Sequence, residues 1–109
     1  MTFVEKGAPA LRALKSNIEK LGAGGSVEIV RVDALAYARA LEANAFDIAL
    51  ADPPYGHGFA AALIEMFART PYAGSLWVEH RISDAVPELP GSRARRYGDT
   101  VITSIPAPE

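Results

Sequence analysis

The chain has 109 residues, of which 50% are hydrophobic and 22% charged, with a formal net charge of −2. This composition excludes an intrinsically disordered chain, and no uncharged apolar run approaches the ~20 residues of a membrane span. The absence of cysteine excludes a disulfide framework, a thiolate metal site and a cysteine nucleophile, and no metal site is expected. We therefore expect a single domain, residues 1–109, with no membrane partner; the lack of a signal-peptide pattern indicates the cytoplasm.

The first half of the chain alternates short strands with helices. A strand tip at residues 2–5 precedes a helix at about residues 8–21, whose apolar side chains recur at helical spacing. Glycines then end that helix. Residues 27–32 are β-branched and nearly continuous, which predicts a buried strand. Asp33 is predicted to cap a short helix that runs to about Glu42.

The second half continues the alternation. A buried strand at residues 46–51 leads directly into a segment with two consecutive prolines, which end the strand. A helix follows from Phe59, and residues 74–80 form a third core strand that includes Trp77 as a core residue. Residues 92–98 and 100–105 are predicted to form a hairpin. The class is α/β, with a mostly parallel sheet covered on both faces and an antiparallel hairpin at its edge.

Acidic residues follow several of the predicted strands: Glu5, Asp33, Asp52 and Glu79. Each alone is explained as a helix cap or a solvated loop residue. Together they would line one rim of the sheet, because ligands bind beyond the carboxyl ends of parallel strands. Carboxylates at that rim can accept hydrogen bonds from ribose hydroxyls and from an exocyclic base amine. The pattern predicts a nucleoside site.

The sequence Asp52-Pro53-Pro54-Tyr55 carries the clearest chemical signal. The lone pair of a base amine is delocalised into the ring, so the amine is a poor nucleophile. A carboxylate and a backbone carbonyl can hold its two hydrogens and favour a pyramidal nitrogen. Proline supplies a carbonyl and a fixed backbone, and a tyrosine can stack on a flipped-out base. The alternative is a proline-rich turn with an incidental aromatic residue.

These segments, taken in order, resemble the RsmD-type family of rRNA methyltransferases, which use S-adenosylmethionine to methylate the N2 amine of a guanine in 16S rRNA. The resemblance rests on several motifs that span the chain: Phe3-Val4-Glu5-Lys6, Val32-Asp33-Ala34, Asp52-Pro53-Pro54-Tyr55, Glu79-His80, and the C-terminal segments Pro87-Glu88-Leu89-Pro90-Gly91 and Arg96-Tyr97-Gly98-Asp99-Thr100. It implies a partial Rossmann-like class I methyltransferase fold, S-adenosylmethionine as cofactor and rRNA as partner.

The resemblance also implies roles for individual residues. The cofactor-binding residues would be Glu5 and Lys6 after one strand, where Glu5 binds the ribose, and Asp33 and Ala34 after the next, where Asp33 meets the adenine amine. The catalytic residues would be Asp52, Pro53, Pro54 and Tyr55.

One part of the family pattern has no counterpart in this sequence. The family has a first strand that ends in a glycine-rich cofactor loop, and the glycines at 22, 24 and 25 do not replace it, since they follow a helix and precede a strand. Loss of a central strand exposes strand edges, and exposed edges pair with other chains. We therefore expect self-association, as a homodimer, or a fragment of a longer gene product. The alternative function is a non-catalytic, partner-binding remnant of a methyltransferase.

Three further features leave alternatives open. Arg93, Arg95 and Arg96 can bind RNA phosphates, but arginines that alternate with Ala94 are also typical of the solvent face of an edge strand. His57, beside the predicted catalytic segment, can contact the substrate, but a histidine between two glycines is also typical of a solvated loop. His80 is either a structural residue or a substrate contact.

Overall fold

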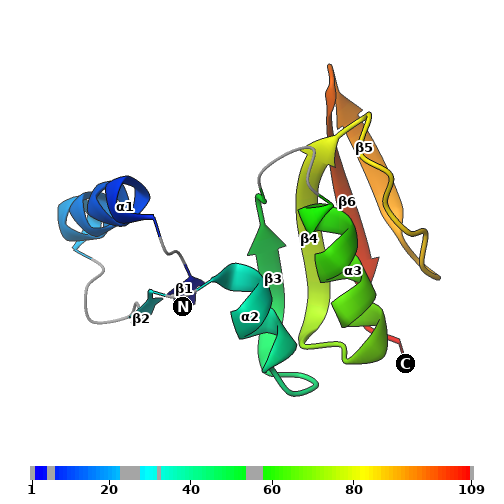
Figure 1. Ribbon diagram of the computed structural model, residues 1–109, viewed down its shortest axis with the longest axis horizontal. Helices are drawn as coiled ribbons and strands as arrows, with labels where there is room; N and C mark the ends of the chain where they lie inside the picture. The colour runs from blue at the N-terminus through cyan, green and yellow to red at the C-terminus, as the bar shows by residue number, and fades with distance from the viewer. Residues whose placement is uncertain (1, 5–6, 23–27, 32, 54–57, 109) are drawn as a thin grey trace. The chain divides into compact units, whose positions relative to one another are not determined.

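The computed structural model describes residues 2–4, 7–22, 28–31, 33–53 and 58–108. Its contacts fall into two compact units, Met1–Tyr37 and Ala38–Glu109, coloured blue to cyan and cyan to red in Figure 1. The helix α2 (Ala34–Arg39) crosses the boundary between the units.

The N-terminal unit is a strand–helix–strand arrangement. The strands β1 (Thr2–Val4) and β2 (Glu28–Val30) pair in parallel, with Phe3 opposite Ile29. The helix α1 (Ala8–Leu21) connects them. It ends because Gly22 takes a left-handed conformation, with φ +66°, from which its N–H bonds back to carbonyls of the last turn.

The C-terminal unit holds a four-stranded mixed sheet in the order β3-β4-β6-β5. The strands β3 (Phe46–Ala51) and β4 (Ala73–Arg81) are parallel. The strands β5 (Arg93–Tyr97) and β6 (Thr100–Pro106) form the predicted hairpin, and β6 pairs antiparallel with β4. The predicted α/β class, with parallel strands and a C-terminal antiparallel hairpin, is confirmed.

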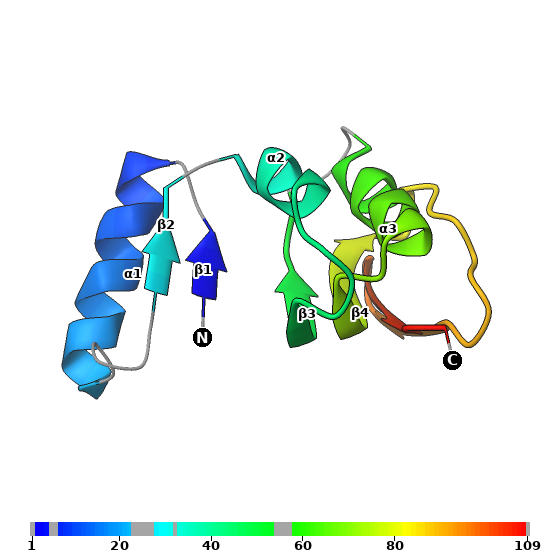
Figure 2. The same ribbon diagram turned by 90° about the horizontal axis from the view of Figure 1, so that it is seen from below.

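One face of this sheet is covered by the helix α3 (Phe59–Arg69), as the two ribbon views agree (Figures 1 and 2). Apolar residues at helical spacing on α3 pack against alternate residues of β4 and β6, which places the core between them. The buried side chains on the helix and the two strands are Ala60, Leu63, Ile64, Phe67, Leu76, Val78, Val101 and Ile105. Tyr72 closes one end of this core, where its hydroxyl donates to the Leu63 carbonyl at 3.0 Å.

The opposite face of the sheet differs from the prediction. Ile48 is 60% exposed, Leu50 80% and Trp77 43%, and the strand registers place them on the same face. The prediction that Trp77 is a core residue is therefore wrong, and so is the prediction that residues 46–51 form a buried strand. The physical reason is that α3 covers only one side, and no other described helix of this unit covers the face with Trp77.

Candidate functional site

The carboxyl groups of Asp52 and Glu79 meet at one edge of the four-stranded sheet. Ala51 pairs with Val78 in the parallel register, so Asp52, directly after β3, lies beside Glu79, which is two residues before the end of β4. Burial, followed by the charge and hydrogen bond of Glu79, raises the pKa of Asp52 above its ordinary value. Two of the four predicted rim acids are thus brought together.

Pro53 continues directly from Asp52 with a backbone carbonyl and no N–H. The predicted catalytic residues Pro54 and Tyr55, and His57 after them, lie outside the described residues. The part of the predicted catalytic motif that the structure describes is therefore the carboxyl group of Asp52 and the backbone carbonyl of Pro53.

A hollow of about 370 Å³ lies at the start of α3. Its volume lies within the usual range of small-molecule pockets. It is lined by the first residues of α3 and by the segment after β4, namely Gly58, Phe59, Ala60, Ala61, Ser83, Asp84 and Ala85. Sequence reasoning missed the contribution of Ser83 and Asp84; the signal that could have found them is a polar turn directly after a core strand.

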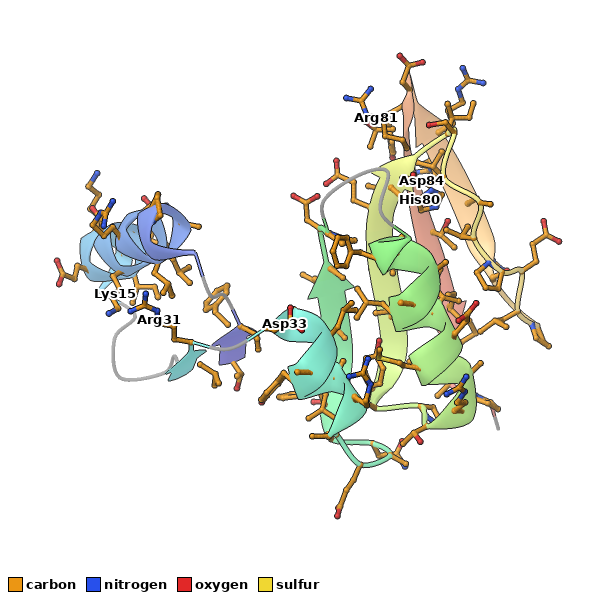
Figure 3. All side chains as sticks on the ribbon, viewed as in Figure 1. Lys15, Arg31, Asp33, His80, Arg81 and Asp84 are labelled. Carbon is orange, nitrogen blue, oxygen red and sulfur yellow. The ribbon has the colours of Figure 1, made fainter. Side chains whose placement is uncertain are left out.

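The end of β4 is a closed turn, and Figure 3 shows Arg81 and Asp84 together there. The Arg81 N–H donates to Asp84 Oδ2 at 2.9 Å, and the Asp84 N–H donates to the Arg81 carbonyl at 3.0 Å. These two reciprocal hydrogen bonds fix the turn after β4, whose residues line one side of the hollow.

His80 belongs to the core rather than to this hollow. It is 4% exposed, and its Nδ1 lies 3.0 Å from the Arg81 carbonyl while Nε2 lies 2.7 Å from Thr103 Oγ1. A carbonyl only accepts, so Nδ1 donates, and in the neutral ring Nε2 accepts the Thr103 hydroxyl proton. Of the two interpretations of His80, the structure supports the structural one.

The predicted cofactor residues lie before this unit. Asp33 caps α2, where its Oδ2 accepts from the Ala36 N–H at 3.1 Å, and Ala34 is the first residue of that helix. Glu5 and Lys6 lie outside the described residues. The prediction that all four acids line one rim is therefore supported for Asp52 and Glu79 alone.

The strand β5 is an exposed edge strand, as expected for alternating arginines. Arg93 and Arg95 are exposed, and Arg96 donates from Nε to the Gly98 carbonyl at 2.7 Å. Among the described residues, no group of three or more His, Asp or Glu side chains is placed to bind a metal ion. None of the described helices combines the length and apolar character needed to cross a membrane.

Comparison with protein families identifies the family of this chain. Residues 1–105 match the profile of the family described as conserved hypothetical protein 95. The chain belongs to this family. A search of curated proteins finds no match.

Several solved structures share the fold of this chain. A Haemophilus influenzae protein named a "putative methylase" is 16% identical, with a TM-score of 0.79, and the match covers 99% of this chain and 72% of that one. The Escherichia coli "putative methyltransferase" yhhF is 20% identical, with a TM-score of 0.72 and coverage of 94% and 59%. A Geobacter sulfurreducens methyltransferase is 15% identical, with a TM-score of 0.65 and coverage of 98% and 58%.

This family member is therefore methyltransferase-like in family and in fold, and the resemblance to RsmD-type methyltransferases is confirmed at that level. The chain spans between 58% and 72% of the length of these three solved structures.

Proposed function

We propose that this chain acts in S-adenosylmethionine-dependent methylation of the exocyclic N2 amine of a guanine in rRNA, in the cytoplasm. The observation that carries the proposal is the pair of carboxyl groups formed by Asp52, which follows the carboxyl end of β3 and directly precedes Pro53, and Glu79 of the parallel strand β4. Ligands of open α/β sheets bind at that edge.

The residues at this edge suit a base amine. An oxygen of Asp52 accepts one amine hydrogen and the Pro53 carbonyl accepts the other, which positions the nitrogen and favours its pyramidal form. The raised pKa of Asp52 makes its carboxylate a better proton acceptor than an isolated aspartate, so it can take the proton that the methylated nitrogen loses. Tyr55 would stack on the base.

The cofactor would be held by Glu5, Lys6, Asp33 and Ala34. When bound, S-adenosylmethionine supplies an electrophilic methyl group. The described members of the set suit this group, because the Asp33 carboxylate, which accepts from the Ala36 N–H, belongs to a side-chain type that offers about four acceptor positions. A helix cap and an adenine amine can therefore share the Asp33 carboxylate.

Calorimetric titration of the purified chain with S-adenosylmethionine and S-adenosylhomocysteine tests the cofactor proposal. We expect binding that Glu5→Ala or Asp33→Ala abolishes and that the control Glu42→Ala leaves unchanged. Absence of binding at millimolar ligand would contradict it.

Transfer of a labelled methyl group to rRNA tests the reaction. Asp52→Ala should abolish transfer. Asp47→Ala changes an exposed acid on β3, the strand that Asp52 follows, and should leave transfer unchanged. Equal rates for both variants would contradict the role of Asp52. Mapping the label to an amine other than guanine N2 would contradict the substrate.

A second candidate function is a non-catalytic module that binds a partner chain. It is favoured by Ile48 and Leu50, which are 60% and 80% exposed on β3, an edge strand of the four-stranded sheet. Exposed apolar side chains on an edge strand are typical of a surface that pairs with another polypeptide. Cofactor binding distinguishes the two candidates.

A further inference from the structure

The sheet face opposite α3 ends in a strongly basic strand. In β5, Arg93, Arg95 and Tyr97 pair with Ser104, Ile102 and Thr100 and lie on the face that carries Trp77. All three are exposed, Tyr97 by 55%. The five residues Arg93–Tyr97 hold 3 of the chain's 11 basic residues, although the net charge is −2. Arg93 and Arg95 place two of these three charges on the face that carries Trp77.

Trp77 adds an aromatic ring to the same face. It lies in one cross-strand row with Ser104 and Arg93. Its Nε1 donates to Ser75 Oγ at 3.1 Å, so its polar group is already bonded within the sheet, and the side chain is still 43% exposed. What it offers to a ligand is therefore apolar ring surface.

We propose that the surface made by Trp77, Arg93, Arg95 and Tyr97, called here the arginine face, binds single-stranded RNA. The guanidinium groups of Arg93 and Arg95 contact phosphates, and the rings of Trp77 and Tyr97 stack on bases. This pairing of cationic side chains with exposed aromatic rings on an open sheet is how proteins hold single strands. Charges alone would suffice to protect an edge strand, and they do not account for two exposed aromatic residues beside them.

The arginine face and the Asp52–Glu79 pair lie on the same sheet. The inference that RNA bound to the face presents a base to Asp52 rests on the proposed function. Glu79 and Arg95 both pair with Ile102, on opposite sides of β6. Since neighbouring strands lie about 4.8 Å apart, Arg95 lies roughly 10 Å from Glu79 and about 14 Å from Asp52 across the sheet. A few nucleotides of single strand cover this span, so RNA on the arginine face can present a base to Asp52.

Fluorescence anisotropy with a short, unstructured, end-labelled RNA, titrated at several salt concentrations without cofactor, tests the proposal. The double variant Arg93→Gln/Arg95→Gln should weaken binding at least tenfold and reduce the salt slope by about 1.4, from two phosphate contacts at about 0.7 each. The variant Tyr97→Ala should weaken binding by about tenfold with the salt slope unchanged, because stacking releases no counterions. Circular dichroism confirms that each variant is folded.

The matched control is Arg12→Gln/Arg69→Gln, which removes the same charge from two exposed helical arginines. Equal weakening by both double variants, or equal affinity for duplex RNA, overturns the proposal. If Arg93→Gln/Arg95→Gln changes the molecular mass of the protein in solution but not its RNA affinity, the proposal is also overturned, because the arginine face is then an interface between protein chains. RNA binding that persists when methyl transfer fails contradicts the proposed function alone, and transfer unaffected by Arg93→Gln/Arg95→Gln contradicts this inference alone.

Discussion

Asp52, directly after β3, lies beside Glu79 of the parallel neighbouring strand β4. Burial and the negative charge of Glu79 disfavour ionisation of Asp52, so Asp52 keeps its proton to a higher pH than usual and its pKa is raised. The pair can therefore accept hydrogen bonds from a base amine. It also lowers the free energy of unfolding at neutral pH.

The variant Glu79→Gln tests this cost. The pKa of Asp52 is raised in the folded state, so its contribution to stability is present at low pH and is lost as pH rises through that raised pKa. Removing the Glu79 charge should lower the pKa of Asp52 and raise the free energy of unfolding at neutral pH, by less than about 1 kcal/mol because Asp52 is largely solvated. Urea denaturation measures the change.

The gain from Glu79→Gln should disappear below pH 3.8, the ordinary pKa of an aspartate, because Asp52 is then protonated and carries no charge for Glu79 to repel. The control Glu65→Gln removes the same charge from an exposed position on α3 and should show no such pH dependence. A gain that is equal at neutral pH and below pH 3.8 would contradict the raised pKa of Asp52.

The elements could be predicted from the sequence because periodicity and breaker residues are local signals. Among the described residues every predicted strand and helix is present, although the helix capped by Asp33 ends at Arg39 rather than near Glu42. Boundaries shift because end residues are decided by pairing partners rather than by their own preference.

Two properties of the site could not be predicted in this way. An apolar run such as residues 46–51 indicates a strand but not whether both faces are covered, so the exposure of Leu50 and Trp77 was missed. The contact between Asp52 and Glu79 depends on the register of β3 against β4, which joins residues far apart in sequence. Register can be observed only in the folded sheet.

Ionisation of the buried Tyr72 destabilises the fold at alkaline pH. It is 3% exposed, its ring meets Phe67 edge-on at 5.3 Å, and burial raises its pKa to about 12 from an ordinary 10.0. Its stabilising contribution is therefore complete below pH 10.0 and is lost as pH rises toward 12. Tyr72→Phe should cost about 1 kcal/mol at neutral pH, from the lost bond to Leu63.

Absorbance titration of the tyrosines checks this assignment. Tyr72→Phe should remove the component that titrates near pH 12, and the control Tyr97→Phe should leave that component in place. If the component persists in Tyr72→Phe, another tyrosine carries it and the assignment is wrong.

The His80–Thr103 bond should stabilise the core. Thr103→Val removes the hydroxyl that bonds Nε2 and leaves a buried imidazole nitrogen without this partner, which should cost about 1–3 kcal/mol of unfolding free energy. Thr103→Ser keeps the hydroxyl and loses one methyl group, at about 0.8 kcal/mol. Urea denaturation compares them, and equal losses would show that packing rather than the hydrogen bond matters.

Gly74 is required where β3 and β4 approach. A Cβ at this position would lie 2.6 Å from the backbone oxygen of Asp47 on the neighbouring strand. Gly74→Ala should therefore destabilise the unit by about 1–3 kcal/mol, because backbone cannot move aside as a side chain can. In Gly98→Ala the Cβ meets nothing within 4 Å, and the cost is only the roughly 1 kcal/mol of its left-handed conformation. Thermal unfolding should rank Gly74→Ala as the less stable variant.

The exposed edge of β3 predicts self-association. Leu50 is 80% exposed on this edge strand, and a lysine there should prevent strand pairing by placing a charge against the partner chain. Light scattering over a range of concentrations should show a dimer for the unmodified chain and a monomer for Leu50→Lys. Leu21→Lys is the matched control, because Leu21 is 81% exposed but lies at the end of α1 rather than on a strand. A monomer at every concentration, or dissociation by both substitutions alike, would count against pairing through β3.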